Sequence, residues 1–462
     1  MKCPRFAAAH GHRIHRVTNS RRRALVFVVA FAVVTTGPVG EISSAIVYGC
    51  CLALPMLRSA KWQLSEFGIS RESWQRSRCV RTATRVTSRN SGVAPASRSH
   101  DVLVLGGGVI GVSVAYQLAQ RGTACLVVDH AGIASCASGK AGGFLARDWT
   151  KGTPLSDLAS RSFDMHAELA RTLNLKTYRR LCCRTVFVSR DGRPDMDRTA
   201  EWADVGVERT QATGTAQTIA QVHPKELVDA LWADAQQRVG SQFVRGTVNE
   251  LLWEGNAESR RAVGALVDGQ EYFADLVVLC MGPWAQVLNE AVPRLKMYGV
   301  KSHSVVMRSE RVLTEAVFFK GMGSPEVYPR SNGDVYVTGQ PDPAVVVDEP
   351  PGNVQVRNNV CDRLEASTRG LSTVLKTAEV TARQACYLPW TADQFPAMGA
   401  LPGYKGAYVC AGHGCWGILT SPASGLGMAE LILDRRASSV DLTPFDPARL
   451  LVADEPSWAP SA

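Results

Sequence analysis

The sequence predicts an α/β fold in which a Rossmann-type dinucleotide-binding domain is interleaved with a second domain built on an antiparallel sheet. Three observations predict it. A βαβ pattern begins at Asp101, two more apolar strands are expected at 276–281 and 407–411, and Asn332-Gly333 separates two strand-like runs. The chain has 462 residues, 45% hydrophobic and 20% charged, which is an ordinary globular composition with room for about two or three domains.

The βαβ unit can be followed residue by residue. Residues 101–105 form an almost wholly apolar run, as a central parallel strand should. GGGVIG follows at 106–111, and residues 112–120 have apolar side chains at helical spacing until Gly122 ends the helix. A second strand at 124–128 ends at Asp129.

Each part of this unit has a physical role. Gly106 allows the tight turn, Gly108 lets the backbone approach a pyrophosphate, and Gly111 lets the helix pack closely on the strand. The helix N-terminus offers unpaired N–H groups to phosphates, and Asp129 lies where an acid can bind ribose hydroxyls. The unit therefore predicts dinucleotide binding.

Three later features favour FAD over NAD. A loop of small residues at 134–143 follows the second strand, Gly282-Pro283-Trp284 follows the strand at 276–281, and the strand at 407–411 runs into loop 412–420 and a helix at 422–433. A cofactor held by loops from both ends of the chain is large, as FAD is. No second βαβ unit that opens on a GxGxxG motif is evident, so no nicotinamide domain is expected.

The chain resembles the FAD-dependent oxidoreductases of the D-amino-acid oxidase, glycine oxidase and sarcosine oxidase superfamily. The matching stretches span 101–436 and include VLVLGGGVIGVSVAYQLAQRG, ASGKAGGFLARDW, VVLCMGPWA, ACYLPWTADQFPAMG and AYVCAGHGCWGILTSPASG. KAGGFLARDW and GHGCWGI are most similar to a eukaryotic branch of oxidoreductases. The resemblance implies FAD and hydride transfer to flavin N5 from a small amine, imino or amino-acid-like substrate.

The resemblance also implies which residues hold the cofactor. It places the glycines and the acid of the βαβ unit on the ADP moiety, the small-residue loop on the pyrophosphate or flavin, and the C-terminal loop at the pyrimidine edge. The residues concerned are Gly106, Gly108, Gly111, Asp129, Ser138, Lys140, Gly143, Val248 (in an expected strand at 243–248), Gly282, Trp284, Gly414, Trp416, Gly417 and Ile418.

The sequence departs from the family at the substrate carboxylate. Glycine-oxidase sequences carry an Arg where this chain has Leu388, and sarcosine-oxidase sequences carry a Lys where it has Trp416. Arg330 or Arg383 could supply the missing cation. Cys386 lies about where sarcosine-type oxidases attach FAD covalently; non-covalent FAD is expected here.

Catalytic candidates follow from the residues near these motifs. His413, beside the flavin loop, could accept a proton or simply bond to backbone, and His303, Tyr328 and Arg330 are candidates for the substrate face. Strand alternation places Lys301 with His303 on one face, and Tyr328 with Arg330 on one face.

The predicted domains are discontinuous. Residues 101–150, 226–294 and 386–436 form the FAD-binding domain, residues 151–225 and 295–385 the substrate domain, and residues 437–462 a C-terminal tail.

Residues 1–100 are expected to be a leader. They hold 14 Arg and 2 Lys against three Glu, and their apolar runs within 24–57 resemble a signal anchor. The segment 58–100 suits an organelle transit peptide, although a disordered tail or a misassigned gene start gives the same composition. An intracellular protein is expected, cytoplasmic or, if the leader is genuine, in a plastid or mitochondrion. Membrane contact is expected only through a retained leader.

The composition also excludes classes of function. The +9 net charge comes from the leader, so nucleic-acid binding is not expected of the body. The 13 cysteines have no CxxC or zinc-like spacing, so no metal is expected. Two functions stay open: an FAD-dependent oxidoreductase with a small-molecule substrate and oxygen as default acceptor, or a flavoprotein assembly or trafficking factor with structural FAD.

Overall fold

The computed structural model describes residues 100–190, 192, 201–256, 259–288 and 295–451, which belong to one compact unit. The predicted leader lies outside the described residues except for His100, and so do residues 452–462 of the predicted tail. No helix within the described ranges is long and apolar enough to span a membrane.

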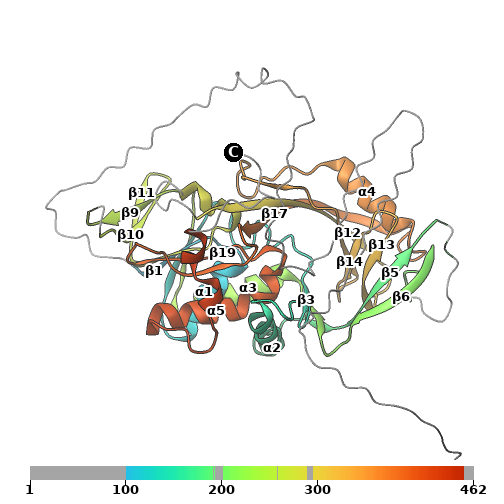
Figure 1. Cartoon of the computed structure of the whole chain (residues 1–462), viewed down its shortest axis with the longest axis horizontal. Coiled ribbons are helices and arrows are strands. Elements are labelled where there is room, and N and C mark those ends of the chain that lie inside the picture. The colour runs from blue at the N-terminus through green and yellow to red at the C-terminus, as the bar shows by residue number, and fades with distance from the viewer. Residues whose placement is uncertain (1–99, 191, 193–200, 257–258, 289–294, 452–462) are drawn as a thin grey trace, which may run out of the picture. The chain divides into compact units, whose positions relative to one another are not determined.

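The first sheet has parallel strands at its centre and confirms the predicted α/β class (Figure 1). Its order is β18-β19-β11-β1-β2-β8, with only the edge strand β18 antiparallel to its neighbour, and β9 and β10 extend it from β11. The strands are β1 (His100–Leu105), β2 (Cys125–Asp129), β8 (Gln242–Arg245), β9 (Val248–Glu254), β10 (Arg261–Val267), β11 (Gln270–Leu279), β18 (Ala397–Ala400) and β19 (Ala407–Ala411). All four parallel strands predicted from the apolar runs are present.

Four helices pack on one face of this sheet, and β9 and β10 pack on the other. The helices are α1 (Val109–Gln120), α2 (Ser156–Thr172), α3 (Pro224–Val239) and α5 (Gly417–Asp434). In β1, Val102 and Val104 pack with the helices, whereas Leu103 and Leu105 pack with β9 and β10. Burial on both faces explains why this strand reads as an uninterrupted apolar run.

Helix α5 begins five residues before the predicted start, and Pro422 lies inside it. Proline has no N–H, so the carbonyl of Ile418 loses its helical partner. The Nε2 atom of buried His166, on α2, donates to that carbonyl (2.9 Å) and to the carbonyl of Leu419 (3.1 Å). The side chain of one helix thus replaces a backbone bond in another.

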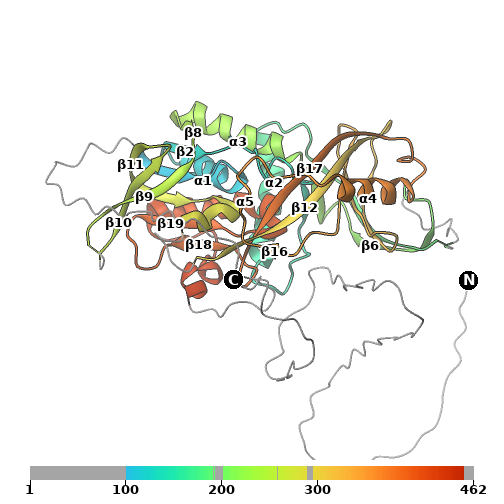
Figure 2. The same ribbon diagram turned by 90° about the horizontal axis from the view of Figure 1, so that it is seen from above.

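The second sheet is antiparallel apart from the β5–β13 pair, and its long strands β12 and β17 run side by side (Figure 2). Its order is β16-β12-β15-β14-β13-β5-β6, with β17 paired to β12. The strands are β5 (Cys182–Val188), β6 (Val207–Gly214), β12 (Met297–Arg308), β13 (Glu315–Lys320), β14 (Glu326–Pro329), β15 (Asp334–Thr338), β16 (Ala344–Val345) and β17 (Glu379–Thr391). The Asn332-Gly333 hairpin is confirmed, because β14 pairs with β15 and Gly333 has φ +88°.

Strand β17 continues through residue 386, where the sequence predicted a return to the cofactor domain, and stays in the antiparallel sheet until Thr391. Helix α4 (Asn358–Arg369) packs on β12 and β15 of the same sheet. A third, small sheet joins β3 (Phe144–Ala146), β4 (Arg179–Arg180) and β7 (Ile219–Gln221).

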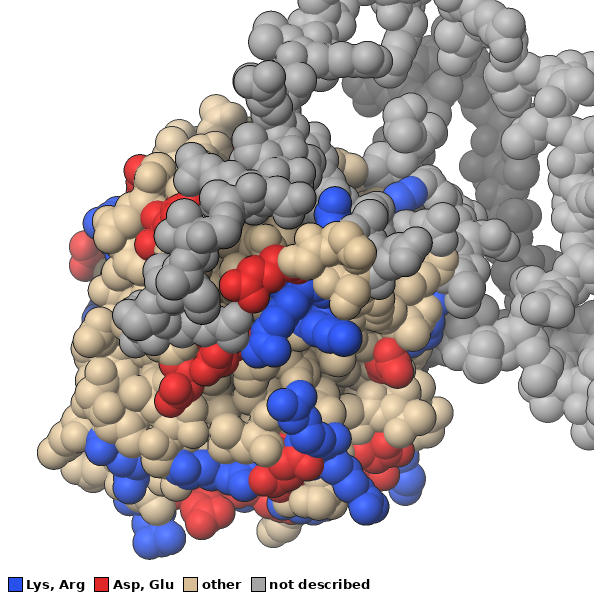
Figure 3. Space-filling model, turned by 90° about the vertical axis from the view of Figure 1, so that its left-hand side faces the viewer, with Lys and Arg blue, Asp and Glu red and all other residues tan. Residues whose placement is uncertain are grey.

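The face of the molecule near β9, β10 and β11 carries both signs of charge (Figure 3). Lys and Arg side chains lie among Asp and Glu side chains over the described part of this face. Attraction to a polyanion needs a continuous field of one sign, and the described part of this face does not present one.

Candidate functional site

One cavity lies at the carboxyl ends of β1, β11 and β19, where open α/β sheets bind their ligands. Loops from distant parts of the chain line it, together with one end of β17. The lining residues include Gly106, Gly108, Asp129, Cys136, Ser138, Thr247, Val248, Met281, Gly282, Trp284, Leu388, Pro389, His413, Gly414, Gly417 and Ile418. The structure thus brings together ten of the fourteen predicted cofactor residues. The other four, Gly111, Lys140, Gly143 and Trp416, are not among its described lining residues.

At its two most crowded positions, the glycine loop after β1 has no room for a side chain. Gly106 has φ +116°, and a Cβ there would lie 2.3 Å from the carbonyl oxygen of Cys280. A Cβ on Gly111 would lie 2.0 Å from the carbonyl oxygen of Gly106. Helix α1 starts directly after Gly108, three residues earlier than predicted, so its first N–H groups point out of the turn.

Asp129 holds this loop in place. Its carboxylate accepts hydrogen bonds from the backbone N–H groups of Gly107 (2.8 Å), Ala131 (2.8 Å) and Gly132 (2.9 Å). Oxygen Oδ2 accepts only one of these bonds and keeps a lone pair for a further donor. The predicted bond to a ribose hydroxyl therefore stays possible, and the backbone bonds are a role that the sequence did not suggest.

Ser138 connects the small-residue loop to α1. Its Oγ accepts the N–H of Val109 at 2.8 Å, the first orphan donor of the helix. A hydroxyl that accepts this bond can still donate its own proton to a phosphate. Lys140 lies farther along the loop, where its Nζ donates to the carbonyl of Ala385 at 3.2 Å.

We expect Ser138→Ala to weaken FAD binding about tenfold, because it removes one donor to the cofactor and leaves the N–H of Val109 without its partner. Titration of the apoprotein with FAD, followed by flavin fluorescence, measures the change. Ser135→Ala is the matched control, since Ser135 donates to the carbonyl of Ala131 in the same loop. Equal affinities for the two variants would contradict the role of Ser138.

The strand expected at 243–248 is wrong. Strand β8 ends at Arg245, and a Gly246-Thr247 turn precedes β9, which starts at Val248. A Cβ on Gly246 would lie 2.5 Å from the side chain of Val267, so a larger residue here would crowd β10. The turn also brings Thr247 to the cavity, a residue that no sequence motif indicated.

The C-terminal loop brings His413 to the cavity wall. The side chain is 3% exposed, its Nε2 lies 3.1 Å from Ser424 Oγ, and its Nδ1 has no hydrogen-bond partner among the described residues. Burial lowers the pKa of His413 to about 3, so the imidazole is neutral at pH 7. Gly414 has φ +55°, and a Cβ there would lie 2.5 Å from the ring of Trp390.

The other catalytic candidates lie outside the cavity lining. His303 is buried, and its Nε2 accepts the N–H of Arg357 at 3.2 Å; Lys301, on the same face as predicted, pairs with Glu349 at 2.6 Å. Burial lowers the pKa of His303. Arg330 donates to the carbonyl of Ala141 at 3.0 Å.

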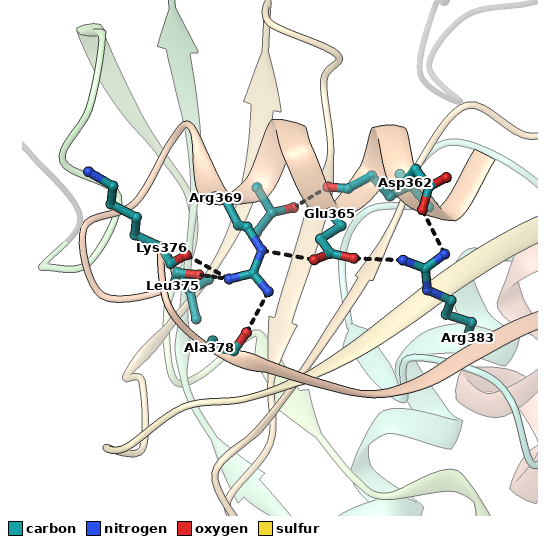
Figure 4. A network of polar contacts seen from close by, with 9 residues as sticks. Asp362, Glu365, Arg369, Leu375, Lys376, Ala378 and Arg383 are labelled. Atoms are coloured by element: carbon teal, nitrogen blue, oxygen red, sulfur yellow. Dashed lines mark hydrogen bonds and ion pairs between the residues drawn. The ribbon is translucent and has the colours of Figure 1, made fainter. Parts of the chain in front are cut away.

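Arg383 and Tyr328 also have other partners. Arg383 pairs with Asp362 (2.7 Å) and Glu365 (2.9 Å) on α4, in the network that Figure 4 shows. Tyr328 stacks on Phe144 with ring centroids 5.1 Å apart, and its hydroxyl donates to Glu326. Neither residue is among the described lining of the cavity.

The residues present fit a dinucleotide with a large ring system. The glycine loop and the start of α1 form a cradle that a Cβ would fill, which suits a pyrophosphate. His413 also lines the cavity, and its Nδ1 has no hydrogen-bond partner among the described residues. Val248, Trp284 and Ile418 are apolar residues of the same lining.

Comparisons with known proteins agree with this geometry. A family model described as FAD dependent oxidoreductase (DAO) matches residues 101–431. A Schizosaccharomyces pombe protein named as an inferred oxidoreductase is 30% identical over 76% of this chain and 98% of its own length. A glycine oxidase of Geobacillus kaustophilus is 25% identical over 76% of this chain and 97% of its own.

Solved structures agree as well. A glycine oxidase from Bacillus cereus matches with a TM-score of 0.60 and 26% identity, over 74% of this chain and 99% of its own. An L-proline dehydrogenase from P. horikoshii matches with a TM-score of 0.63 but 18% identity, which shows a shared fold alone.

Proposed function

Since this chain belongs to the DAO family of FAD-dependent oxidoreductases, we propose that it oxidises the CH–NH bond of a small amine or imino compound with non-covalent FAD. The observation that carries the proposal is the cavity at the ends of β1, β11 and β19, which is lined by loops from both ends of the chain. Oxygen is the proposed acceptor.

In this proposal, the chain's own residues bind the cofactor and the substrate and position one against the other. Bound FAD supplies a hydride acceptor, so the protein has to hold the substrate against it and keep water away. His413 is a weak base, because its pKa of about 3 leaves it without a proton at neutral pH. We therefore assign His413 a hydrogen-bonding role toward the cofactor, and the substrate enters with its amine already neutral.

Binding of the proposed substrates does not require a cation that holds a substrate carboxylate. Leu388 lines the cavity at the position where glycine-oxidase sequences carry an Arg. Arg383 is paired with two acids of α4, and Arg330, which donates to a backbone carbonyl and has a buried Nε without a partner among the described residues, is not among the described lining residues of the cavity. A buried carboxylate needs a fixed cation, so an amine without a carboxylate suits this site better.

Anaerobic reduction tests the substrate class. The full-length protein loaded with FAD is mixed with N-methylated alkylamines and with the corresponding N-methyl amino acids, and loss of visible flavin absorbance is followed. We expect the alkylamines to reduce the flavin with the higher kcat/KM. Reduction by amino acids alone would overturn the substrate class. Retention of FAD with no reduction by any compound would favour the alternative of an assembly or trafficking factor.

Acid precipitation tests the mode of FAD binding. Non-covalent FAD is released into the supernatant, and colour in the pellet would contradict the proposal. Support comes from Cys386, which is buried and is not among the described lining residues of the cavity.

We expect Arg383→Gln to cost about 0.5–1 kcal/mol of stability, because its ion pairs with Asp362 and Glu365 are partly exposed. Its kcat/KM should stay within about twofold of wild type, since the side chain does not reach the described cavity. Urea unfolding and steady-state assays measure the two effects. A selective loss of activity toward carboxylate-bearing substrates would instead make Arg383 the clamp.

We also propose that residues 1–100 act as a targeting leader to an organelle. The support is their composition, 14 Arg and 2 Lys against three Glu. N-terminal sequencing of the protein isolated from its own cells tests this: a mature N-terminus near residue 100 is expected, and an intact Met1 would contradict it.

A further inference from the structure

A short segment between β16 and α4, residues 349–352, reaches the loops that line the cavity. Pro351 is itself one of the lining residues. Gly352 has φ +81°, and a Cβ there would lie 2.5 Å from the side chain of Ala131, in the loop after β2. The N–H of Gly352 donates to Cys136 Sγ at 3.1 Å, and Cys136 lines the cavity as well. We call residues 349–352 the strap.

Glu349 holds the other end of the strap through three contacts. Its backbone carbonyl accepts the Nε1–H of Trp284 at 2.8 Å, and Trp284 lines the cavity after β11. Its Oε1 atom pairs with Lys301 Nζ, on β12, at 2.6 Å. Its Oε2 atom accepts the N–H of Gln355 at 2.9 Å. One residue thus joins the strap both to the cavity wall and to the antiparallel sheet.

The ion pair between Lys301 and Glu349 is more shielded than an ordinary surface pair. The side chain of Lys301 is 9% exposed and that of Glu349 is 26% exposed. Exposed ion pairs contribute little, whereas removal of one partner from a shielded pair leaves a charge that water cannot solvate. The pair therefore fastens the strap firmly, and it gives Lys301 a role that its position on the sheet did not reveal.

The backbone of the strap has few attachments of its own. Within the described chain, residues 349–352 form no backbone–backbone hydrogen bond with another segment; the N–H of Asn353 bonds to the carbonyl of Pro350 inside the same turn. The preceding strand β16 pairs with β12 over two residues only. A segment with few backbone bonds opens at a lower free-energy cost than a sheet does. The strap can therefore leave the cavity wall without disrupting either large sheet.

We propose that Glu349 is a positioning residue for the cofactor, which fastens the strap over the cavity so that FAD enters and leaves only when the strap opens. While the strap is closed, Glu349 holds Trp284 and Pro351 in the cavity wall. The rates of FAD association and dissociation then both scale with the small fraction of protein whose strap is open. The inference rests on FAD as the cofactor and not on the proposed amine substrate.

FAD-binding kinetics of the full-length protein test the strap. Flavin fluorescence in a stopped-flow instrument gives the association rate with the apoprotein, and dilution of the holoenzyme gives the dissociation rate. We expect Glu349→Gln to raise both rates about tenfold, the effect of one lost charge-assisted hydrogen bond. The dissociation constant should stay within about threefold of wild type, because both rates change together. Loss of a contact to FAD would instead raise the dissociation rate alone.

Glu315→Gln is the matched control for Glu349→Gln. The carbonyl of Glu315 accepts the Nε1–H of Trp202 at 3.1 Å, and its carboxylate pairs with Arg184 at 2.9 Å. Glu315 lies on β13 of the same antiparallel sheet and is not among the described lining residues of the cavity. The same substitution therefore breaks the same kinds of contact away from the strap, and both FAD rates should stay at the wild-type values.

A double variant separates opening of the strap from general destabilisation. Glu349→Gln alone leaves the shielded ammonium of Lys301 without its acid, which destabilises the fold as a whole. Lys301→Met combined with Glu349→Gln removes both charges, so it should regain stability in urea unfolding and keep the fast FAD rates. Hydrogen exchange measured on the apoprotein gives a readout without FAD: the peptide that covers residues 349–357 should exchange faster in both variants than in wild type.

Three results would overturn the proposal. The first is a faster dissociation rate with an unchanged association rate in Glu349→Gln. The second is equal FAD rates in Glu349→Gln and Glu315→Gln, and the third is a return to wild-type rates in the double variant. Failure of every amine to reduce the flavin would overturn the proposed function and leave these rates unaffected, so the two failures are distinguishable.

Discussion

Gly111→Ala is expected to abolish most FAD binding and to destabilise the protein by about 2 kcal/mol. Alanine is the better helix former by about 1 kcal/mol, so propensity alone predicts the opposite sign. The new Cβ, however, would lie 2.0 Å from the carbonyl oxygen of Gly106, a backbone atom that cannot move without opening the turn. Overpacking of this kind costs about 3 kcal/mol and exceeds the gain in propensity.

Urea unfolding of the apoprotein and titration with FAD measure the two effects of Gly111→Ala. Gly370→Ala is the matched control, because Gly370 ends α4 with φ −74° and its Cβ would lie 3.4 Å from the nearest atom. The control should keep wild-type affinity and stability. If Gly111→Ala also kept both, the close approach of α1 to the glycine loop would not be what forms the cradle.

Acidification from pH 7 to pH 5 is expected to destabilise the protein by about 4 kcal/mol through His166 and His413 alone. Burial lowers the pKa of His166 to about 4 and of His413 to about 3, against about 6.5 in the unfolded chain. The unfolded chain therefore binds protons in this range and the folded protein does not. The stability is fully present above pH 6.5 and falls toward the folded pKa, by about 2 kcal/mol for each residue at pH 5.

The pH dependence of urea unfolding measures this effect. His166→Gln should lower stability at pH 7, because the carbonyls of Ile418 and Leu419 lose a donor, yet its stability should fall less steeply toward pH 5. His413→Asn should flatten the curve similarly. His130→Gln, at an exposed side chain, is the control and should keep the wild-type slope. A wild-type slope in both buried variants would show that these rings are not kept neutral by the fold.

The cofactor half of the site could be predicted from sequence because its requirements are local. Gly106, Gly108 and Asp129 act through backbone geometry within one βαβ unit, and the structure places all three at the cavity. Local pattern was less informative at 243–248. There we expected one strand, whereas β8 pairs with β2 and ends at Arg245, and Val248 starts β9, which pairs with β10.

The substrate half could not be predicted in the same way. Alternation correctly placed Lys301 and His303 on one face, but it does not say what covers that face. Both residues contact segment 349–357, and Arg383 contacts α4, so the cations meet acids or backbone from elsewhere in the chain.

The neighbours of β1 also bear on how the protein is made. In the sheet, β11 lies next to β1 and ends at Leu279, and β19 lies beyond β11 at Ala407–Ala411. Helix α5 completes the apolar cover of α1. Because synthesis proceeds at about 5–20 residues per second, β1 leaves the ribosome long before β19 does. The nascent chain therefore exposes an apolar strand and an incomplete nucleotide cradle for much of its synthesis. Assistance by a chaperone during translation, and cofactor loading only after release, are the expected consequences for expression.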